Sequence, residues 1–288
     1  MSEPATGDIL AGVAGWPVFH SLSPRMHRFW LHEHEVRGAY IALPVRRTDL
    51  STALAGLRVA GFVGVNLTVP HKEAGFALAH TADRAAHMAL AANVLLFHND
   101  TWDAFNTDAE GLKRSLEESL GETAAGVRRI VVLGAGGAAR AAVLACDGLG
   151  AKEIWILNRT RSRAETLVQQ LSSSVRARLG AAEWDAWKAL APATRLLVNA
   201  TSAGLNGTPS PPVALETLPR DAAVCDLVYN PLETPLLARA RACGLTSIDG
   251  LGMLLHQGAL AFELLFGVRP SVSSSLRSHL EQVLRNGA

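Results

Sequence analysis

The sequence predicts an α/β protein with two domains. Short apolar segments alternate with helical stretches along most of the chain, which is the pattern of a sheet covered by helices. A polar, glycine-bearing segment at residues 121–129 separates two such series. With 288 residues, of which 49% are hydrophobic, the chain is long and apolar enough to bury two cores.

The first series alternates predicted strands with predicted helices in the N-terminal third of the chain. The pair Ser23-Pro24 marks the start of the first helix, because a polar cap followed by proline is typical of helix N-termini. The apolar runs predicted as strands are residues 9–15, 39–45, 62–67, 92–97 and 101–105. The predicted helices are residues 25–36, residues 49–59 and a segment that begins at residue 71.

The second series follows a long helix that is predicted from Thr107-Asp108 to Leu120. Its predicted strands are residues 130–133, 153–157, 196–199, 223–228 and 246–248. Its predicted helices are residues 137–146, 162–171, 251–266 and 273–284. Residues 206–212 are predicted to form a proline-rich loop.

Composition and charge argue against several classes of protein. A net charge of +1 does not favour a general surface for nucleic acid or anionic membranes. The longest apolar run, residues 88–97, is too short to cross a bilayer, and residues 1–8 lack the basic start of a signal peptide. Three cysteines without a C-x-x-C pair, Cys146, Cys225 and Cys243, fit a reducing compartment. We therefore expect a cytoplasmic protein, either a monomer or a homodimer.

The histidines and tryptophans do not indicate a ligand site. His27, His32 and His34 lie on one predicted helix, but spacings of five and two do not place all three on one face. We therefore expect no metal. The six tryptophans are scattered, and we interpret them as packing residues.

A glycine-rich turn in the second series predicts a dinucleotide site. The apolar strand at residues 130–133 runs into Gly134-Ala135-Gly136-Gly137-Ala138-Ala139, and an alanine-rich helix follows. This strand, turn and helix are the context in which G-x-G-x-x-G/A binds a pyrophosphate at a helix N-terminus. The pattern predicts a Rossmann-type doubly wound domain. The alternative is a glycine turn without a ligand.

The end of the next predicted strand favours NADP over NAD. NAD-selective sites usually place Asp or Glu near this position to bind the ribose 2′-hydroxyl. Here Asn158-Arg159-Thr160-Arg161 follows the strand, with Arg163 nearby and no carboxylate among them. A guanidinium can hold a 2′-phosphate through charge and paired donors. The alternative is a solvated basic loop.

Two regions of the first series carry groups suited to alcohol chemistry. Ser21 and Ser23 offer hydroxyls just before a helix, where they can bind a polyol or carboxylate, or simply form a turn and a cap. Lys72 follows a predicted strand, and Asp108 opens a predicted helix. An alcohol loses its O–H proton as its C–H hydride leaves, so a lysine and an aspartate together can accept and relay that proton. The alternatives are a surface lysine and a capping aspartate.

Nine short segments, in order from Gly15 to Gln257, resemble the shikimate dehydrogenase family. They read GWPVFHSLSP, NLTVPHK, AANV, FNTD, GAGGAARA, NRT, NATSAG, DLVYNP and DGLGMLLHQ. Each is weak or moderate alone, but chance is a poor explanation for nine in the family's order. The resemblance implies an oxidoreductase that reversibly reduces 3-dehydroshikimate to shikimate with NADPH, a step of chorismate and aromatic amino acid biosynthesis.

The resemblance also implies roles for individual residues. Lys72 is the implied acid–base residue, with Asp108 as its partner. The implied substrate contacts are Ser21, Ser23 and Tyr229 at the carboxylate, and Thr68, Asn93, Asp108 and Gln257 at the ring hydroxyls. The implied cofactor contacts are Gly134, Ala135, Gly136, Gly137 and Ala138 at the pyrophosphate, Asn158, Arg159, Thr160 and Arg163 around the adenosine phosphate, and Leu227 and Gly250 at the nicotinamide end.

The family's fold implies how the chain is divided. Residues 1–108, joined by the C-terminal helices at residues 255–288, are expected to form the substrate-binding and catalytic domain. Residues 109–254 are expected to form the NADP-binding Rossmann domain. Gln257 is thereby assigned to the substrate domain although it follows the second series in sequence.

Two positions depart from the family's usual pattern. Val94 stands where the family has threonine after the asparagine, which affects either ring-hydroxyl binding or local packing. Leu90 stands where glycine is more usual. Because Val94 puts the exact substrate in question, a quinate/shikimate or aminoshikimate dehydrogenase is the alternative. A non-catalytic NADP-sensing module is less favoured, since a sensor needs neither Lys72 nor Asp108.

Overall fold

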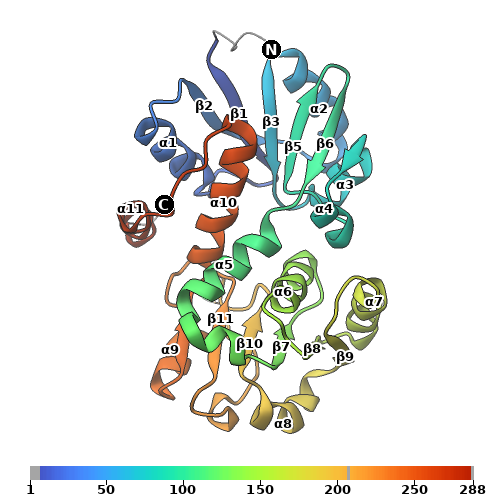
Figure 1. The fold of residues 1–288 in the computed structure, drawn as a ribbon, viewed down its shortest axis with the longest axis vertical. Helices are drawn as coiled ribbons and strands as arrows, with labels where there is room; N and C mark the ends of the chain where they lie inside the picture. Colours follow the sequence, from blue (N-terminus) through green and yellow to red (C-terminus); the bar gives the residue numbers. More distant parts are fainter. Residues whose placement is uncertain (1–6, 206–207, 287–288) are drawn as a thin grey trace. The chain divides into compact units, whose positions relative to one another are not determined.

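In the computed structural model the chain divides into two units, and the structure describes residues 7–205 and 208–286 (Figure 1). The first unit combines Met1–Thr107 with Gln257–Ala288, and the second unit is Asp108–His256. Each unit contains one six-stranded sheet with helices packed on it. The predicted fold class, α/β with two domains, is confirmed.

The sheet of the first unit has the strand order β2-β1-β3-β5-β6-β4. Strand β1 is parallel to both of its neighbours, β2 and β3, whereas β5 is antiparallel to β3 and to β6. The strands are β1 (Ile9–Gly15), β2 (Gly38–Pro44), β3 (Phe62–Leu67), β4 (Thr81–Ala82), β5 (Val94–His98) and β6 (Thr101–Phe105). The segments that leave β1 and β3 therefore start from the same edge of the sheet.

Six helices contribute to the first unit. They are α1 (Ser23–Glu33), α2 (Leu50–Val59), α3 (Lys72–Leu78), α4 (Arg84–Ala89), α11 (Ser274–Arg285) and the part of α10 (Gly250–Phe266) that begins at Gln257. Helix α1 packs on β1, β2 and α11, and α2 packs on β3. One core cluster includes Leu54, Val65 and Leu95. Around α1, a second buried group brings Trp30 edge-on to Phe262 of α10.

The sheet of the second unit has the order β12-β11-β10-β7-β8-β9, and all of its pairs are parallel. Its strands are β7 (Arg129–Leu133), β8 (Glu153–Leu157), β9 (Arg178–Ala182), β10 (Leu196–Asn199), β11 (Ala223–Asp226) and β12 (Thr246–Ile248). The chain builds outward from β7 in one direction, then returns to β10 on its other side. This is the doubly wound Rossmann order, whose ligand crevice lies outside the carboxyl ends of the strands where the direction reverses.

Alternating side chains of β7 explain why both faces of this sheet are covered. Ile130 and Val132 lie in a core cluster with residues of α5 (Asp108–Leu120), α6 (Gly137–Gly148) and α7 (Arg161–Leu171). Val131 and Leu133 lie in another cluster with residues of α8 (Trp187–Leu190) and α9 (Pro235–Ala242). Successive residues of a strand point to opposite faces, so a continuous apolar run is needed for a sheet covered on both.

Short 3₁₀ helices complete the described elements. They are Arg47–Asp49, Gly121–Gly126, Trp184–Ala186, Ala191–Ala193 and Leu215–Thr217. The predicted linker at residues 121–129 is therefore partly a 3₁₀ helix that leads into β7. Asn206 and Gly207 of the predicted proline-rich loop lie outside the described residues.

Most of the predicted strands and helices are confirmed within a few residues, and the exceptions have physical reasons. Helix α4 is six residues long and α9 eight, too short for a clear helical period. Strand β9 is an edge strand with no fully buried residue, so it lacks an apolar run. The expectation that Ser23 caps α1 is wrong: Leu22 occupies that position, and no side chain caps the helix there.

The three cysteines differ in exposure. Cys146 of α6 and Cys225 of β11 are buried in the core of the second unit, whereas Cys243, at the end of α9, is partly exposed. Burial raises the pKa of the Cys146 thiol to about 12 and raises that of Cys225 as well. Across the described residues, no helix has the length and apolarity needed to span a membrane.

Candidate active site

Close packing brings the segments after β1 and β3 together. A side chain at Gly15 would overlap with Thr68, so only glycine allows this approach. Backbone hydrogen bonds fix the contact, since Thr68 N–H donates to the Ala14 carbonyl at 2.9 Å and Trp16 N–H donates to the Val69 carbonyl at 3.1 Å. The hydroxyl of Thr68 and the serines that follow β1 therefore start from neighbouring positions.

Ser21 and Ser23 form a small hydrogen-bonded turn at the start of α1. The Ser21 hydroxyl accepts the backbone N–H of Ser23 at 3.2 Å. Ser23 is buried, and its hydroxyl lies within hydrogen-bonding reach of the phenol of Tyr40 on β2. Both hydroxyls are thus held in place by the fold of the first unit.

Lys72 is the first residue of α3, and its backbone is anchored next to Asn93. The Lys72 carbonyl accepts the backbone N–H of Ala92 at 2.8 Å. The preceding residue, His71, is fully buried, and its Nε2 lies 2.7 Å from the Val45 carbonyl oxygen. The lysine side chain therefore projects from a rigid backbone and is half-buried.

Hydrogen bonds join Asn93, Thr107 and Gln257, which lie far apart in the sequence of the first unit. Asn93 Nδ2 donates to Thr107 Oγ1 at 2.7 Å and to Gln257 Oε1 at 3.2 Å. Asn93 Oδ1 accepts the Thr107 backbone N–H at 2.8 Å, and the Thr107 hydroxyl donates to the Gln257 carbonyl at 3.0 Å. Asp108 follows Thr107 directly in the chain as the buried first residue of α5. Two amides suited to binding hydroxyls are thereby assembled across 164 residues of sequence.

In the second unit, the glycine turn after β7 has room for a ligand. Gly134 has a φ of +102°, and a side chain there would lie 3.0 Å from Thr201 Cγ2, so glycine is required by conformation and by space. Side chains at Gly136 or Gly137 would meet nothing within 4 Å. Gly136 caps α6 without a side-chain hydrogen bond to the helix N-terminus. An open, glycine-lined helix N-terminus fits a dinucleotide pyrophosphate.

Beside this turn lies a cavity of about 550 Å³ within the second unit. It is lined by Asn158, Arg159, Trp184, Thr201, Ser202, Ala203, Thr208, Pro209, Ser210, Pro211 and Pro212. Asn158 Nδ2 donates to the Thr160 carbonyl at 2.8 Å, which holds the loop after β8 in shape. A cavity of this size, with an arginine on its wall, fits the nucleoside end of the cofactor.

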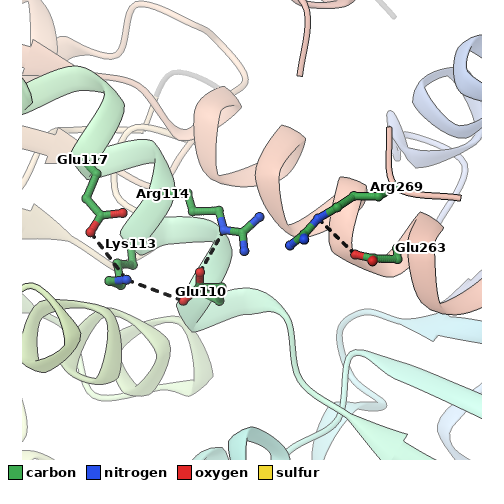
Figure 2. A network of polar contacts seen from close by, with 6 residues as sticks. All are labelled: Glu110, Lys113, Arg114, Glu117, Glu263 and Arg269. Atoms are coloured by element: carbon green, nitrogen blue, oxygen red, sulfur yellow. Dashed lines mark hydrogen bonds and ion pairs between the residues drawn. The ribbon is translucent and has the colours of Figure 1, made fainter. Parts of the chain in front are cut away.

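Arg159 and Arg163 differ from other basic residues, including the neighbouring Arg161, in their ion-pair partners. On α5, Lys113 lies 3.4 Å from Glu117 and Arg114 lies 2.8 Å from Glu110, and in the first unit Arg269 lies 3.2 Å from Glu263 (Figure 2). Arg161 pairs with Glu165 in the same way. Within residues 7–205 and 208–286, Arg159 and Arg163 have no ion-pair partner, so both charges are available to an anion.

The remaining predicted cofactor residues lie after β11. The backbones of Leu227 and Gly250 approach so closely that a side chain at Gly250 would overlap with the Leu227 carbonyl. Burial raises the pKa of Tyr229, so its phenol stays protonated at neutral pH and can donate a hydrogen bond. Across the described residues, no three His, Cys, Asp or Glu side chains gather as metal ligands would.

Comparison with known proteins identifies the family. Residues 13–95 match the family profile "Shikimate dehydrogenase substrate binding domain", residues 117–205 match "Shikimate / quinate 5-dehydrogenase", and residues 250–274 match "Shikimate 5'-dehydrogenase C-terminal domain". A shikimate dehydrogenase (NADP(+)) of Methylobacterium radiotolerans is 46% identical over 275 residues, 94% of this chain and 95% of that protein. The chain belongs to the shikimate dehydrogenase family.

Solved structures show the same fold over nearly the whole chain. Shikimate 5-dehydrogenase of Thermus thermophilus, in complex with NADP(H) and shikimate, is 37% identical with a TM-score of 0.82 and covers 97% of this chain and 100% of that one. A ligand-free 5-ketofructose reductase of a Gluconobacter strain is 31% identical with a TM-score of 0.85 and covers 98% and 99%. Proteins that resemble this chain in sequence and fold are thus named for different substrates.

In this shikimate dehydrogenase family member, the two residues that depart from the family's usual pattern have different structural surroundings. Val94 is fully buried and pairs through its backbone with Asn66 and Phe105, which favours the packing interpretation. Leu90 ends α4 in the left-handed conformation, with a φ of 47°. That conformation explains why glycine is more usual at this position, since a Cβ is strained there.

The sequence prediction did not single out several residues that line the cavity. Trp184 lines it and also packs against the core of the second unit, as expected for a packing residue. Thr201 and Ser202 also line it, because a buried network holds their loop: Thr201 Oγ1 donates to Asn199 Oδ1 at 2.7 Å, and Asn199 Nδ2 donates to Asp226 Oδ1 at 2.8 Å. The NATSAG segment follows β10, which neighbours β7, and this position was the available signal.

Proposed function

We propose that the protein catalyses the reversible, NADPH-dependent reduction of 3-dehydroshikimate to shikimate. Membership of the family and the NADP-dependent relatives support this reaction. The observation that carries it in the chain itself is the joining of Asn93, Thr107 and Gln257, which assembles hydroxyl-binding amides close to the backbone of Lys72. The cofactor supplies or accepts the hydride, and the chain provides the remaining groups.

In the direction of shikimate oxidation, we assign proton removal to Lys72. As the C–H hydride leaves the alcohol carbon, the O–H proton passes to the Lys72 amine, with Asp108 as its partner. In the other direction the lysine returns that proton to the carbonyl oxygen. The half-buried amine at the start of α3 is suited to this role because the helix start fixes the backbone from which it projects.

The other proposed substrate contacts are neutral. The hydroxyls of Ser21 and Ser23, with the phenol of Tyr229, would donate to the substrate carboxylate. Thr68, Asn93, Asp108 and Gln257 would bind the ring hydroxyls, since amides and hydroxyls both donate and accept. Because the carboxylate is bound without a permanent cation, the position of each hydroxyl is the basis of selectivity.

The proposed cofactor contacts divide by the part of the cofactor that they would touch. The turn formed by Gly134, Ala135, Gly136, Gly137 and Ala138 would bind the pyrophosphate. Asn158, Arg159, Thr160 and Arg163 would surround the adenosine phosphate, and Leu227 and Gly250 would lie at the nicotinamide end. The unpaired guanidinium of Arg159 on the wall of the cavity supports a 2′-phosphate and therefore NADP.

Initial rates test this function most directly. Purified protein would be assayed with shikimate, quinate and 5-ketofructose, each with NADP and with NAD in the matching redox state. We expect the highest kcat/KM for shikimate with NADP. A higher kcat/KM for quinate would establish the alternative substrate, and NADP binding without turnover of any of the three would point to the sensing module.

Cellular location and assembly extend the proposal. We propose a cytoplasmic enzyme, supported by the free cysteines. Both a monomer and a homodimer are compatible with the proposed site, because all of its residues come from one chain. Sedimentation of the purified protein at several concentrations would distinguish them.

A further inference from the structure

The phenol of Tyr40 lies buried between two groups of proposed substrate contacts. Tyr40 is 2% exposed, and its hydroxyl donates to Asn66 Oδ1 at 2.7 Å. The hydroxyl of Ser23 lies within hydrogen-bonding reach of the same phenol. Asn66 in turn donates from Nδ2 to the Asn93 carbonyl at 3.0 Å. A line of polar groups within the first unit therefore runs from Ser23 through Tyr40 and Asn66 to Asn93.

The direction of these hydrogen bonds is fixed by counting protons. Asn66 uses its amide N–H toward the Asn93 carbonyl, so its oxygen faces Tyr40 and needs a donor there. A phenol has a single proton, and Tyr40 gives it to Asn66. Toward Ser23 the phenol oxygen can therefore only accept. It follows that a hydrogen bond between the two hydroxyls must be donated by Ser23.

We propose that Tyr40 is a positioning residue that holds the Ser23 hydroxyl and the Asn93 backbone in register for substrate binding. This inference rests on the proposed function. When the substrate carboxylate arrives, the Ser23 hydroxyl turns and donates to it instead of to Tyr40. The phenol oxygen loses one accepted hydrogen bond but keeps its bond to Asn66, so the rest of the chain of hydrogen bonds stays in place.

The surroundings of Tyr40 keep this network uncharged. The His27 ring stacks on the phenol ring, with centroids 3.8 Å apart and an interplanar angle of 9°. Burial raises the pKa of Tyr40 well above its usual value and lowers the pKa of His27 to about 3. Both rings are therefore neutral at neutral pH, and the phenol keeps the proton that the Asn66 oxygen requires.

Removal of the phenol hydroxyl tests the role of Tyr40. Tyr40→Phe keeps the ring stacked on His27 and removes only the hydroxyl. We expect KM for shikimate to rise roughly 5- to 50-fold, because the buried Asn66 oxygen loses its donor and the Asn93 backbone loses its support. We expect kcat to change by less than about threefold, and KM for NADP to stay unchanged, because the second unit is untouched.

A matched control is available in the second unit. Thr194 is fully buried, and its hydroxyl donates to the Leu190 carbonyl at 2.8 Å. Thr194→Val removes one buried hydroxyl without touching a proposed contact, so it should lower Tm and leave KM for shikimate unchanged. If Tyr40→Phe only lowers Tm, with KM for shikimate within twofold of the wild type, the phenol is merely structural and the proposal is wrong.

The effect of Tyr40→Phe in a Ser23→Ala protein tests whether Tyr40 acts through Ser23. Ser23→Ala removes the hydroxyl that the phenol is proposed to hold. In this background, Tyr40→Phe should raise KM for shikimate by a smaller factor than in the wild type, because only the Asn66 branch remains. Equal factors in both backgrounds would show that the two residues act independently, which contradicts the proposal.

A spectroscopic measurement needs no Tyr40 variant and so does not depend on how that variant folds. The chain has only two tyrosines, so ¹³Cζ-labelled tyrosine gives two signals, which Tyr229→Phe assigns. Saturation with shikimate should shift the Tyr40 signal in the wild type and should not shift it in Ser23→Ala. A Tyr40 signal that stays fixed in the wild type would overturn the exchange of the Ser23 proton.

Failure of this inference and failure of the proposed function give different results. If the wild-type protein turns over shikimate with NADP but Tyr40→Phe matches it, the function stands and the role of Tyr40 is lost. If the wild-type protein neither binds nor turns over shikimate, the proposed function itself is wrong, and the inference falls with it.

Discussion

The proposed substrate contacts of the first unit are mainly side chains, whereas the proposed cofactor contacts of the second are mainly backbone and exposed charge. In the first unit, Asn93 is hydrogen-bonded to Thr107 and Gln257. In the second, Gly136 and Gly137 leave open space before a helix N-terminus, and Arg159 is exposed on the wall of a cavity. Small polyols are distinguished by individual hydroxyls, whereas a dinucleotide is bound by its phosphates, and this difference matches the roles that we propose for the two units.

This difference predicts where substitutions act. Changes to the buried side chains of the first unit should affect substrate and chemistry, and changes at the loop after β8 should affect the choice between cofactors. A substitution in the first unit that changed the preference between NADP and NAD would contradict these proposed roles. The four predictions below are ordered by the size of the expected effect.

The largest effect is expected at Lys72. Lys72→Ala should lower kcat for shikimate oxidation by roughly 10²- to 10⁴-fold, because general acid–base catalysis contributes about that much. The Kd for NADP should not change. Lys113→Ala is the matched control, since Lys113 is paired with Glu117 on the surface of α5, and it should keep full activity. Unchanged turnover in Lys72→Ala would remove the lysine from the reaction.

Arg159 should decide the preference for NADP. Arg159→Ala should raise KM for NADP by roughly 10- to 150-fold, as expected for a lost hydrogen bond to a charged group, and should change KM for NAD far less. Arg161→Ala is the control two residues away, because Arg161 is already paired with Glu165 at 2.8 Å. Equal effects of Arg159→Ala on the two cofactors would rule out a contact with the 2′-phosphate.

His27 should make the first unit sensitive to acid. Its pKa is lowered by burial from 6.5 to about 3, so the folded state favours the neutral ring. Between pH 6.5 and 3 the His27 ring binds a proton in the unfolded state but not in the folded state. The free energy of unfolding is therefore unaffected above pH 6.5 and falls below it by about 1.4 kcal/mol, or tenfold in the folding equilibrium, per pH unit. Denaturant unfolding of His27→Phe at several pH values should show a weaker acid dependence.

The exposed histidine on the same helix provides the comparison for this prediction. His32 is exposed, so His32→Gln should unfold with the same pH dependence as the wild type. An identical acid dependence in His27→Phe and the wild type would mean that His27 is not neutral and buried in solution.

The smallest effect is expected at Leu90. Leu90→Gly should stabilise the protein by about 1 kcal/mol, because the steric cost of leucine in the left-handed conformation exceeds the entropic cost of glycine. Leu78→Gly is the control at the end of α3, where φ is not positive, and it should destabilise the protein by about the same amount. A lower Tm for Leu90→Gly would contradict the inference that the backbone is strained at Leu90.

The second unit was the easier of the two to predict from sequence. Its inner strands are buried on both faces, so runs such as residues 130–133 are continuously apolar, and the glycine turn announces the helix that follows. Edge strand β9 and the short helix α9 lack such signals. The strand-to-helix junctions before α1 and α6 could be located from sequence, because serine, proline and glycine mark them locally.

The site was harder to predict than the fold. Gly134 and Arg159 stand out through local patterns, but Gln257 is joined to Asn93 only by the folded chain, and its role came from the family resemblance. The hydrogen bonds of Tyr40 with Asn66 and Ser23 leave no trace in the sequence, because contacts between β2, β3 and α1 are tertiary. Trp184 packs against the core as predicted, but sequence gives no sign that it also lines a cavity.

The difference in exposure among the three cysteines determines which of them can be labelled. A thiol reacts with maleimides as the thiolate, and at neutral pH the raised pKa values of Cys146 and Cys225 leave almost none of that form in the core. Cys243 is partly exposed. A fluorophore maleimide should therefore attach once per native chain, at Cys243, and provide a reporter on the second unit without any mutation.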